Sequence, residues 1–574
     1  MNPGTPPAGG GSSYERGKAA SDWLPRLVFW ATAVVLLFLS LGEKSLWRSE
    51  DRWAEIAREM IQSGDYWHPT LNGEPYTYKP LLGYWWIAWL ARLTGNLSEW
   101  TVRVPSVLAG LVALWATRDL GRRLWSREVG TIAGWLLLTT YGFLTWARLG
   151  EADMENLAAS TLAIAWYWRR RNHLGFATWL LFYGICFVGA HCKGLTALVV
   201  PVLAILPDIL ASGRWRSVFC VSHFVAGIIG MGIYLSPFMI LSWKGSDVPS
   251  ADLGSVFQEN FQRYFSAFDH VEPFYVYLYY LPELVLPWAP LLIVSVVGAA
   301  GSYRSWDDRV QWLLLAGLLI FLFFTASGSR RVYYILPILP LSALLMAIVV
   351  RSGRFASWVR LALAMPMTVF LVWALGATLA PGIWLIVKDQ AALAPPEGFL
   401  WKVSVLGLAS VLLIALSRGK PPRLPRVMGL DSYLGLAVGL SVVLVGGTLC
   451  WLDAKLEPLR TKKPFSIQLG EMASAVGPER VAFFERTYPE VLFHADLNVP
   501  VRVVSGASEL GAFLGQDGPD KLLVVSGRQM EIVRPLLPEG VFESPALRET
   551  VQPWEEHRMS RKLVVFRVPG NPDR

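Results

Sequence analysis

The sequence is poor in charge. Only 17% of its 574 residues are Asp, Glu, Lys or Arg, whereas 53% are hydrophobic, and the mean hydropathy is +0.39. A soluble chain of this length needs far more charge to cover its surface, so most of this chain is predicted to lie in lipid. The formal net charge of +8 does not indicate a nucleic-acid partner. The arginines form short clusters between apolar runs, where orientation in a membrane explains them better.

Cysteine is scarce as well. The four cysteines lie in or beside apolar runs without metal-ligand spacing, which predicts neither a disulfide framework nor a zinc site; they are Cys186, Cys192, Cys220 and Cys450. Residues 454–574 lack a Gly-rich phosphate loop, a metal cluster and a nucleophile elbow. Short β-branched runs such as "RVAFFER" and "KLLVVSG" alternate there with helix-like stretches. This pattern predicts a small α/β domain. The missing motifs favour a lid or docking module without chemistry of its own.

Long apolar runs fill the rest of the chain. A bilayer core of about 30 Å needs roughly 20 apolar residues per helix. About thirteen runs qualify, although 155–168 and 176–192 are short. The predicted spans are residues 25–43, 103–121, 130–147, 155–168, 176–192, 195–211, 218–241, 280–299, 311–327, 333–350, 358–380, 400–417 and 432–453. The fold class is therefore a polytopic α-helical membrane protein.

One apolar segment, residues 79–95, decides the topology. As a span it would place the cluster from Arg118 to Arg127 outside the cytoplasm. As an interfacial helix it makes that cluster cytoplasmic, together with Arg169 to Arg171, Arg214 with Arg216, Arg304 with Arg309, Arg351 with Arg354, and Arg418 to Arg426. We adopt the interfacial interpretation. It predicts a disordered cytoplasmic N-terminus at 1–24, a transmembrane domain at 25–453 with a first outer loop at 44–102, and an extracytoplasmic α/β domain at 454–574. In a bacterium, this topology predicts that the transmembrane domain lies in the inner membrane and that the first outer loop and the α/β domain lie in the periplasm.

Two outer loops carry carboxylates close to lipid. In "SEDRWAEIAREMIQSGDYW", Glu50 and Asp51 begin an amphipathic helix, and in "ARLGEADMEN" Asp153 lies near the end of a predicted span. Carboxylates at this depth are costly unless they are paired or line a cavity, so they are candidates for a functional site. A solvated helix cap with internal ion pairs is the simpler interpretation of the first group.

Cations are predicted on the same side, namely Arg52, Lys79, Lys193, Arg263, Arg330 and Arg331. Each one alone is more typical of an interface anchor. Together with the carboxylates they suit a reaction in which a hydroxyl attacks and a phosphate leaves, because the carboxylates activate the hydroxyl and the cations stabilise the departing charge.

These loops resemble those of the GT-C superfamily of glycosyltransferases. The closest likeness is to lipid A aminoarabinose transferases and to the protein O-mannosyltransferase-like group (families 39 and 83). The motifs that carry it are "SEDRWAEIAREMIQSGDYW", "LNGEPYTYKP", "EWTVRVPS", "CKGLTALVVP" and "SGSRRVYYILPILP", spread over residues 25–350. The resemblance implies a GT-C fold and inverting transfer of a sugar from a polyprenyl (undecaprenyl) phosphate carrier.

The resemblance also suggests roles for particular residues. The leading loop Asp of the family is Ser49 here, so the catalytic carboxylate falls to Asp153, Glu50 or Asp51, unless the chain is an inactive homologue. The residues implied for the donor phosphate and lipid are Arg52, Lys79, Arg263, Lys193, Tyr333 and Tyr334. No metal is required with a monophosphate leaving group, although the acidic loops could hold a divalent cation.

The acceptor is left open by the sequence. We expect the acceptor to be lipid A or another envelope lipid. The alternative acceptors are a protein hydroxyl and an envelope glycan. A lipid-linked sugar flippase is the alternative from another class, but such pathways place ionisable groups near the bilayer midplane and show internal repeats. Neither feature is visible in the sequence. The expected partners are the sugar donor, a lipid or glycan acceptor and membrane lipids, and the expected state is a monomer.

Overall fold

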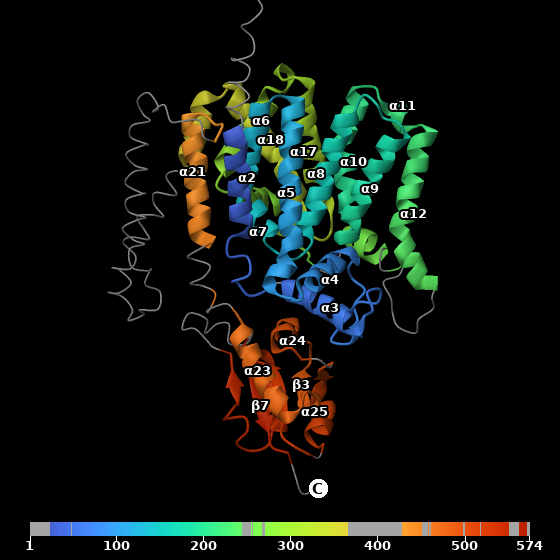
Figure 1. Ribbon diagram of the computed structural model, residues 1–574, viewed down its shortest axis with the longest axis vertical. Coiled ribbons are helices and arrows are strands. Elements are labelled where there is room, and N and C mark those ends of the chain that lie inside the picture. The colour runs from blue at the N-terminus through green and yellow to red at the C-terminus, as the bar shows by residue number, and fades with distance from the viewer. Residues whose placement is uncertain are drawn as a thin grey trace, which may run out of the picture.

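The computed structural model shows three parts (Figure 1). The first is a helical bundle, the second is a pair of helices across one end of the bundle, and the third is a C-terminal sheet with its helices. The structure describes residues 23–365 except 48, 244–253, 255–256 and 267–269, and then residues 428–449, 457, 461–497, 500–516, 518–549 and 562–570. The predicted N-terminal tail, the predicted span 400–417 and most of the span 358–380 fall outside these residues.

The bundle is built from helices of the first 447 residues. Its elements are α2 (Trp23–Phe38), α5 (Glu99–Leu124), α6 (Arg127–Leu138), α7 (Tyr141–Ala147), α8 (Asp153–Arg170), α9 (Phe176–Cys192), α10 (Thr196–Ala211), α11 (Trp215–Val218), α12 (Val221–Trp243), α14 (Arg263–Phe265), α15 (Tyr277–Val285), α16 (Ala289–Gly301), α17 (Asp308–Ala326), α18 (Leu339–Ser352) and α21 (Ser432–Gly447). The π-helix η1 (Gln258–Gln262) and the 3-10 helices η2 (Tyr303–Ser305) and η3 (Val332–Ile338) complete it.

Helices α5, α6 and α8 pack at the centre of the bundle, with side chains such as Leu114, Trp135 and Leu157 fully buried. Glycine allows α5 and α6 to approach closely, because a Cβ atom on Gly130 would lie 2.5 Å from the carbonyl oxygen of Arg118. Outward-facing side chains of the peripheral helices are apolar and exposed, as expected for a surface that meets lipid.

Among the described residues, four helices are long and apolar enough to cross a membrane, and a fifth span results if α15 and α16, bent by 119°, count as one. Other predicted spans appear as shorter apolar helices or are interrupted. The expected span 130–147, for example, is divided into α6 and α7. The predicted total of about thirteen spans remains a prediction.

The first loop contains α3 (Glu50–Ser63), the short strands β1 (Thr70–Leu71) and β2 (Glu74–Pro75), and α4 (Leu82–Thr94). Helices α3 and α4 lie across the end of the bundle (Figure 1). The apolar face of α3, which includes Trp53, Ile56 and Met60, packs against α4, and the rings of Trp53 and Tyr84 lie 4.4 Å apart. With 13 residues, α4 is too short to span a bilayer, in keeping with the predicted interfacial helix.

The C-terminal segment forms a five-stranded sheet of order β4-β3-β5-β7-β6. The pairs β3–β4 and β3–β5 are parallel, whereas β7 is antiparallel to β5 and β6. Its elements are α23 (Lys463–Val476), η6 (Pro478–Arg480), β3 (Val481–Phe484), α24 (Pro489–Ala495), β4 (Arg502–Val504), α25 (Gly506–Leu514), β5 (Lys521–Ser526), η7 (Gly527–Gln529), α26 (Met530–Val533), η8 (Arg534–Leu536), β6 (Leu547–Arg548) and β7 (Leu563–Val568). Strands β3, β4, β5 and β7 form in the four β-branched runs from which strands were predicted.

This segment docks on the first loop through α24, which packs against α3. Arg58 of α3 bonds Asp496 at 3.0 Å and the carbonyl oxygen of Leu497 at 2.9 Å. The side chain of Asn72 bonds both the N–H and the carbonyl of Val501, each at 2.7 Å. Such paired contacts fix the C-terminal segment against the end of the bundle where the two predicted acidic loops lie.

Candidate active site

Asp153 and Lys193 form a buried ion pair at the end of the bundle covered by α3 and α4. Lys193 Nζ lies 2.8 Å from Asp153 Oδ2 and also donates to the carbonyl oxygen of Glu151 at 2.7 Å. Their side chains are only 8% and 16% exposed. Asp153 opens α8, where the N-terminal end of the helix dipole favours its negative charge. Lys193 directly follows α9 and precedes Gly194, whose φ of 142° suits glycine.

The surroundings of Lys193 keep it charged. Burial alone favours the neutral amine, but the carboxylates of Asp153 and Glu151 raise the pKa of Lys193 above its ordinary value. The ammonium group also lies 5.6 Å from the ring of Trp53 and 5.5 Å from the ring of Tyr333. Burial raises the pKa of Glu151, Lys193 opposes that rise, and Asp153 adds to it. The start of α8, the residue after α9, the first loop and η3 therefore meet around the Asp153–Lys193 pair.

Two connected cavities flank this pair. The first, which we name the apolar groove, has a volume of about 560 Å³ and is lined by Asp153 and by apolar side chains such as Val199, Phe323 and Phe324. The second, the polar chamber, has a volume of about 670 Å³ and is lined by polar groups such as Arg52, Glu151 and Arg331. Six residues line both cavities and form what we call the junction: Tyr78, Lys79, Lys193, Arg263, Tyr333 and Tyr334.

The junction and the chamber are rich in cations. Lys79, Lys193 and Arg263 come from the first loop, the end of α9 and the start of α14. In the chamber, Arg331 donates from Nη2 toward His270 Nδ1 at 2.6 Å, while its buried Nε has no hydrogen-bond partner among the described residues. A buried N–H without a partner is costly, so the chamber suits an anionic or polar ligand.

Of the predicted site residues, the structure brings together Asp153, Arg52, Lys79, Lys193, Arg263, Tyr333 and Tyr334. Arg52 lines the chamber and lies 5.6 Å from the ring of Tyr76. Arg330, in contrast, bonds the carbonyl oxygens of Glu272 and Thr325, which ties loops together.

Glu50 does not line either cavity. It is fully buried and accepts from Arg103 at 2.8 and 2.9 Å, from the N–H of Gly150 at 2.8 Å and from the N–H of Trp47 at 3.0 Å. Arg103 also donates to the carbonyl oxygens of Leu41, Lys44 and Ser45. With both carboxylate oxygens engaged, Glu50 joins the first loop, α5 and the loop before α8.

Asp51 also lies outside both cavities, on the side of α3 near the C-terminal segment. Burial raises the pKa of Asp51 well above its ordinary value, and the nearby carboxylates of Glu490 and Glu50 raise it further. Its Oδ1 is buried without a hydrogen-bond partner among the described residues. A carboxyl group in this position favours the protonated form, which suits a structural contact better than proton abstraction in the chamber.

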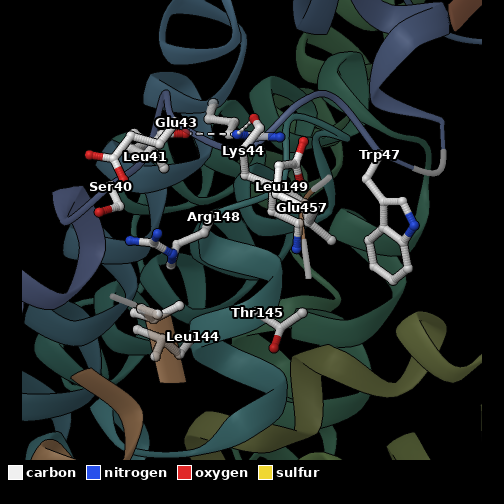
Figure 2. Close-up of a pocket in the computed structure, with 12 residues that line it drawn as sticks. Ser40, Leu41, Glu43, Lys44, Trp47, Leu144, Thr145, Arg148, Leu149 and Glu457 are labelled. Atoms are coloured by element: carbon white, nitrogen blue, oxygen red, sulfur yellow. Dashed lines mark hydrogen bonds between the residues drawn. The ribbon is translucent and has the colours of Figure 1, made fainter. Parts of the chain in front are cut away.

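A separate small cavity of about 250 Å³ lies between the loop after α2 and helix α7 (Figure 2). Arg148 lines it and donates to the carbonyl oxygens of Leu36, Leu37 and Leu39 at 2.8, 3.0 and 2.6 Å. These carbonyls end α2, so the arginine caps the helix. Arg103, also in its wall, is engaged with Glu50 and three carbonyls, and the cavity is therefore bounded by structural cations.

Several chamber residues were not predicted. Tyr78 directly precedes Lys79, and Tyr280 lies in α15, whereas His270 and Glu272 come from the loop before α15, which has no recognisable pattern. Tyr280 donates to Glu272 at 2.6 Å. Arg103 lies in the motif "EWTVRVPS", but no local pattern in the sequence indicates that it pairs with Glu50. Within the described part of the chain, no group of three or more His, Cys, Asp or Glu residues is arranged to hold a metal ion.

A family model and a solved structure show which fold class the protein belongs to. The family model described as dolichyl-phosphate-mannose-protein mannosyltransferase matches residues 78–243, which include Lys79, Asp153 and Lys193. The crystal structure of ArnT from Cupriavidus metallidurans bound to undecaprenyl phosphate is similar, with a TM-score of 0.69 and 21% identity over 95% of this chain and 98% of that chain. The protein thus has the membrane GT-C fold, as the loop motifs predicted.

Curated relatives show which transferases within this fold the chain resembles in sequence. The undecaprenyl phosphate-alpha-4-amino-4-deoxy-L-arabinose arabinosyl transferase of Edwardsiella ictaluri is 29% identical over 56% of this chain and 60% of its own length. The corresponding transferase 1 of Sodalis glossinidius is 31% identical over 58% of this chain and 59% of its own length. The matches thus span about 60% of these relatives. The predicted resemblance to lipid A aminoarabinose transferases is confirmed.

Proposed function

We propose that the protein is an inverting membrane glycosyltransferase that moves a sugar from a polyprenyl phosphate carrier to an acceptor hydroxyl. The observation that carries this proposal is the Asp153–Lys193 pair, placed where an apolar groove meets a cation-rich polar chamber. This arrangement offers a groove for a lipid tail and a chamber for a polar acceptor. The carboxylate of Asp153 lines the groove and is held beside the junction by Lys193. The matched relatives carry undecaprenyl phosphate in their names, which supports the same donor class here.

In the proposed mechanism, the polyprenyl tail lies in the apolar groove and its phosphate reaches the junction, near Lys79 and Arg263. The acceptor hydroxyl enters through the polar chamber and transfers its proton to Asp153 as its oxygen attacks the anomeric carbon. The bond between that carbon and the phosphate oxygen breaks on the opposite face, so the configuration inverts. The departing polyprenyl phosphate keeps the electron pair, and the junction cations stabilise its added charge.

Lys193 serves two roles in this scheme. It holds Asp153 Oδ2 at 2.8 Å, which fixes the carboxylate, and it adds a positive charge beside the leaving phosphate. Glu50 and Asp51, offered by the sequence as alternative catalytic groups, are assigned to structural contacts instead. The donor phosphate is neutralised by side chains, so the mechanism needs no metal.

The proposed orientation places the groove and chamber at the outer leaflet, with the N-terminus in the cytoplasm and the C-terminal α/β segment in the periplasm of a bacterial inner membrane. Arginines concentrate at the opposite end of the bundle, which agrees with the positive-inside rule. The proposed acceptor is lipid A or another envelope lipid, which follows from the resemblance to aminoarabinose transferases, the activity that these two relatives carry in their names.

A transfer assay tests the proposal. The full-length protein in lipid nanodiscs is given radiolabelled polyprenyl-phosphate sugar and a lipid A acceptor, and D153N is compared with wild type. We expect a loss of about 100-fold or more, because general-base catalysis contributes roughly 10²–10⁴-fold. D65N is the matched control, since Asp65, in the first outer loop, pairs with His68 at 2.7 Å and lines neither cavity. Wild-type turnover by D153N would overturn the assignment.

Identifying the acceptor requires a second experiment. Mass spectrometry of envelope lipids and proteins from cells with and without the gene should show one added sugar on lipid A that depends on Asp153. The same dependence on a protein or glycan would retain the transferase and change only its acceptor.

A further inference from the structure

A second charged cavity lies at the end of the bundle opposite α3 and α4. It has a volume of about 520 Å³ and is lined by four arginines, Arg26, Arg118, Arg122 and Arg127, which come from α2, α5 and the start of α6. Trp30 and Trp115 contribute aromatic walls. The proposed sugar transfer has no use for this cavity, because it lies at the far end of α5 from the junction.

Arg118 is the innermost of these cations. Its guanidinium carbon lies 3.8 Å from the centre of the Phe29 ring and 5.8 Å from that of Trp30, and its aliphatic part lies against Gly134, where a Cβ atom would come within 2.7 Å. Its Nη1 is buried, and the described residues offer that nitrogen no hydrogen-bond acceptor. A half-buried guanidinium donor without an acceptor is costly, and an anionic ligand would remove that cost.

The acidic residues in the cavity wall do not fill this need. Asp119 bonds Arg122 at 2.6 Å and Arg123 at 2.5 Å, and Glu128 bonds Arg351 at 2.5 Å. The cavity therefore has four guanidinium groups against two carboxylates, and both carboxylates already bind arginine. Its electrostatic potential favours an anion.

The rim of the cavity continues into an apolar surface. Along α2, Trp23 and Leu27 are 58% and 55% exposed, and Trp115 on α5 is 45% exposed. A site of this kind, with cations inside and exposed apolar side chains at its rim, accommodates a ligand with a charged phosphate and hydrocarbon chains. Tryptophan is also enriched where a bilayer meets water, at the depth of lipid phosphates.

We infer that this cavity binds the phosphate of an anionic phospholipid from the leaflet opposite the proposed transfer site. In this arrangement the phosphate accepts from Arg118, the rim arginines Arg26 and Arg127 attract it, and the acyl chains lie along α2. The inference is independent of the proposed transfer reaction, because it requires only that the bundle spans a bilayer.

Native mass spectrometry of the full-length protein in detergent tests the inference. The protein is titrated with phosphatidylglycerol, with phosphatidylcholine and with inorganic phosphate. We expect wild type to hold one phosphatidylglycerol about tenfold more tightly than phosphatidylcholine, because both lipids carry a phosphate but the cavity arginines repel the choline cation. R118Q, with one cation fewer in the cavity, should lose that preference. Inorganic phosphate at millimolar concentration should not displace the lipid.

R170Q is the matched control, because Arg170 also lies over a tryptophan, 5.2 Å from the ring of Trp166, but outside the cavity. It should bind lipid as wild type does. If thermal unfolding shows that R118Q is misfolded, the double variant R26Q/R127Q decides, since both side chains are exposed. Unchanged lipid preference in the folded cavity variants, an equal loss in R170Q, or full displacement by inorganic phosphate would each overturn the inference.

Discussion

The two ends of the helical bundle hold charge in different ways. At the end covered by α3 and α4, buried pairs join residues far apart in sequence, as in Asp153–Lys193 and Glu50–Arg103. Around the arginine-lined cavity at the opposite end, Asp119 pairs with Arg122 and Arg123 of its own helix, and Arg351 pairs with Glu128 on the surface. Elsewhere at that end, Arg171, directly after α8, pairs with the buried Asp208 of α10. The first kind of pair requires the tertiary fold, whereas the Asp119 pairs require only a helix.

The difference has an energetic meaning. Burying two charges costs several kcal/mol of desolvation, which their attraction offsets only with good geometry, whereas an exposed pair contributes about 0–1 kcal/mol. Buried pairs therefore indicate positions where the charged groups have a functional or structural role, such as catalysis or the joining of loops. The comparison predicts large effects for the buried pairs at the end covered by α3 and α4, and small effects for the pairs around the arginine-lined cavity, in the order below.

The largest effect is expected for K193Q. Removal of the ammonium group leaves Asp153 buried next to Glu151 without its cation, and takes a charge from the junction. Transfer should fall by about 100-fold or more in the radiolabel assay. K462Q is the control, because Lys462 also bonds a carboxylate, that of Glu490, at 2.5 Å, but lies outside the cavities. Equal losses in the two variants would contradict a special role for the Asp153–Lys193 pair.

The next effect concerns stability. R103Q leaves Glu50 as a buried carboxylate without its cation and frees the carbonyl oxygens of Leu41, Lys44 and Ser45. Breaking a buried pair in this way costs about 3–5 kcal/mol, so the midpoint of thermal unfolding should fall clearly. A midpoint within a degree or so of wild type would show that Glu50 does not hold the first loop in place.

A smaller effect is expected when pH changes, because pH should alter the stability of the contact between α3 and the C-terminal segment. Burial raises the pKa of Glu55 to about 7, although Arg58 opposes the rise. Because the folded pKa lies above the unfolded one, the contact gains stability as pH falls from about 7 toward 4.5 and loses it as pH rises through 7. The change should be roughly 1–3 kcal/mol.

Hydrogen exchange in α24 measures this contact, and protection should be greater at pH 5.5 than at pH 8. E55Q is the matched variant, since it is neutral at both values and should remove the dependence. A dependence that persists in E55Q, or one of opposite sign, would contradict the role of Glu55.

The smallest effect is expected for R351Q at the opposite end. The side chains of Arg351 and Glu128 are 58% and 51% exposed, so water already screens both charges. Loss of the pair should change stability by no more than about 0.5 kcal/mol. A loss as large as that of R103Q would remove the distinction between the two ends.

The sequence predicted much of this architecture because its signals are local. Apolar runs indicated the bundle, helical periodicity indicated α3, and β-branched runs indicated the strands of the C-terminal sheet. Interruptions inside the runs, such as the break between α6 and α7, were missed because apolar composition continues across them.

The site was predicted in part. Proximity to predicted span ends identified Asp153 and Lys193, which the structure pairs, but the same criterion selected Glu50 and Asp51. Whether a carboxylate faces a cavity or an arginine depends on partners distant in sequence, and Arg103 lies 53 positions from Glu50. His270 and Glu272 join the chamber through a loop whose course no local pattern specifies.

The central claim is that the junction between groove and chamber holds the phosphate of a polyprenyl carrier. A structure of the protein determined with polyprenyl phosphate in a lipid nanodisc tests it most directly. The account predicts the phosphate at about 3 Å from Lys79, Lys193 or Arg263, with the lipid tail running past Phe323 and Phe324. A phosphate bound in the arginine-lined cavity at the opposite end, with the junction empty, would contradict it.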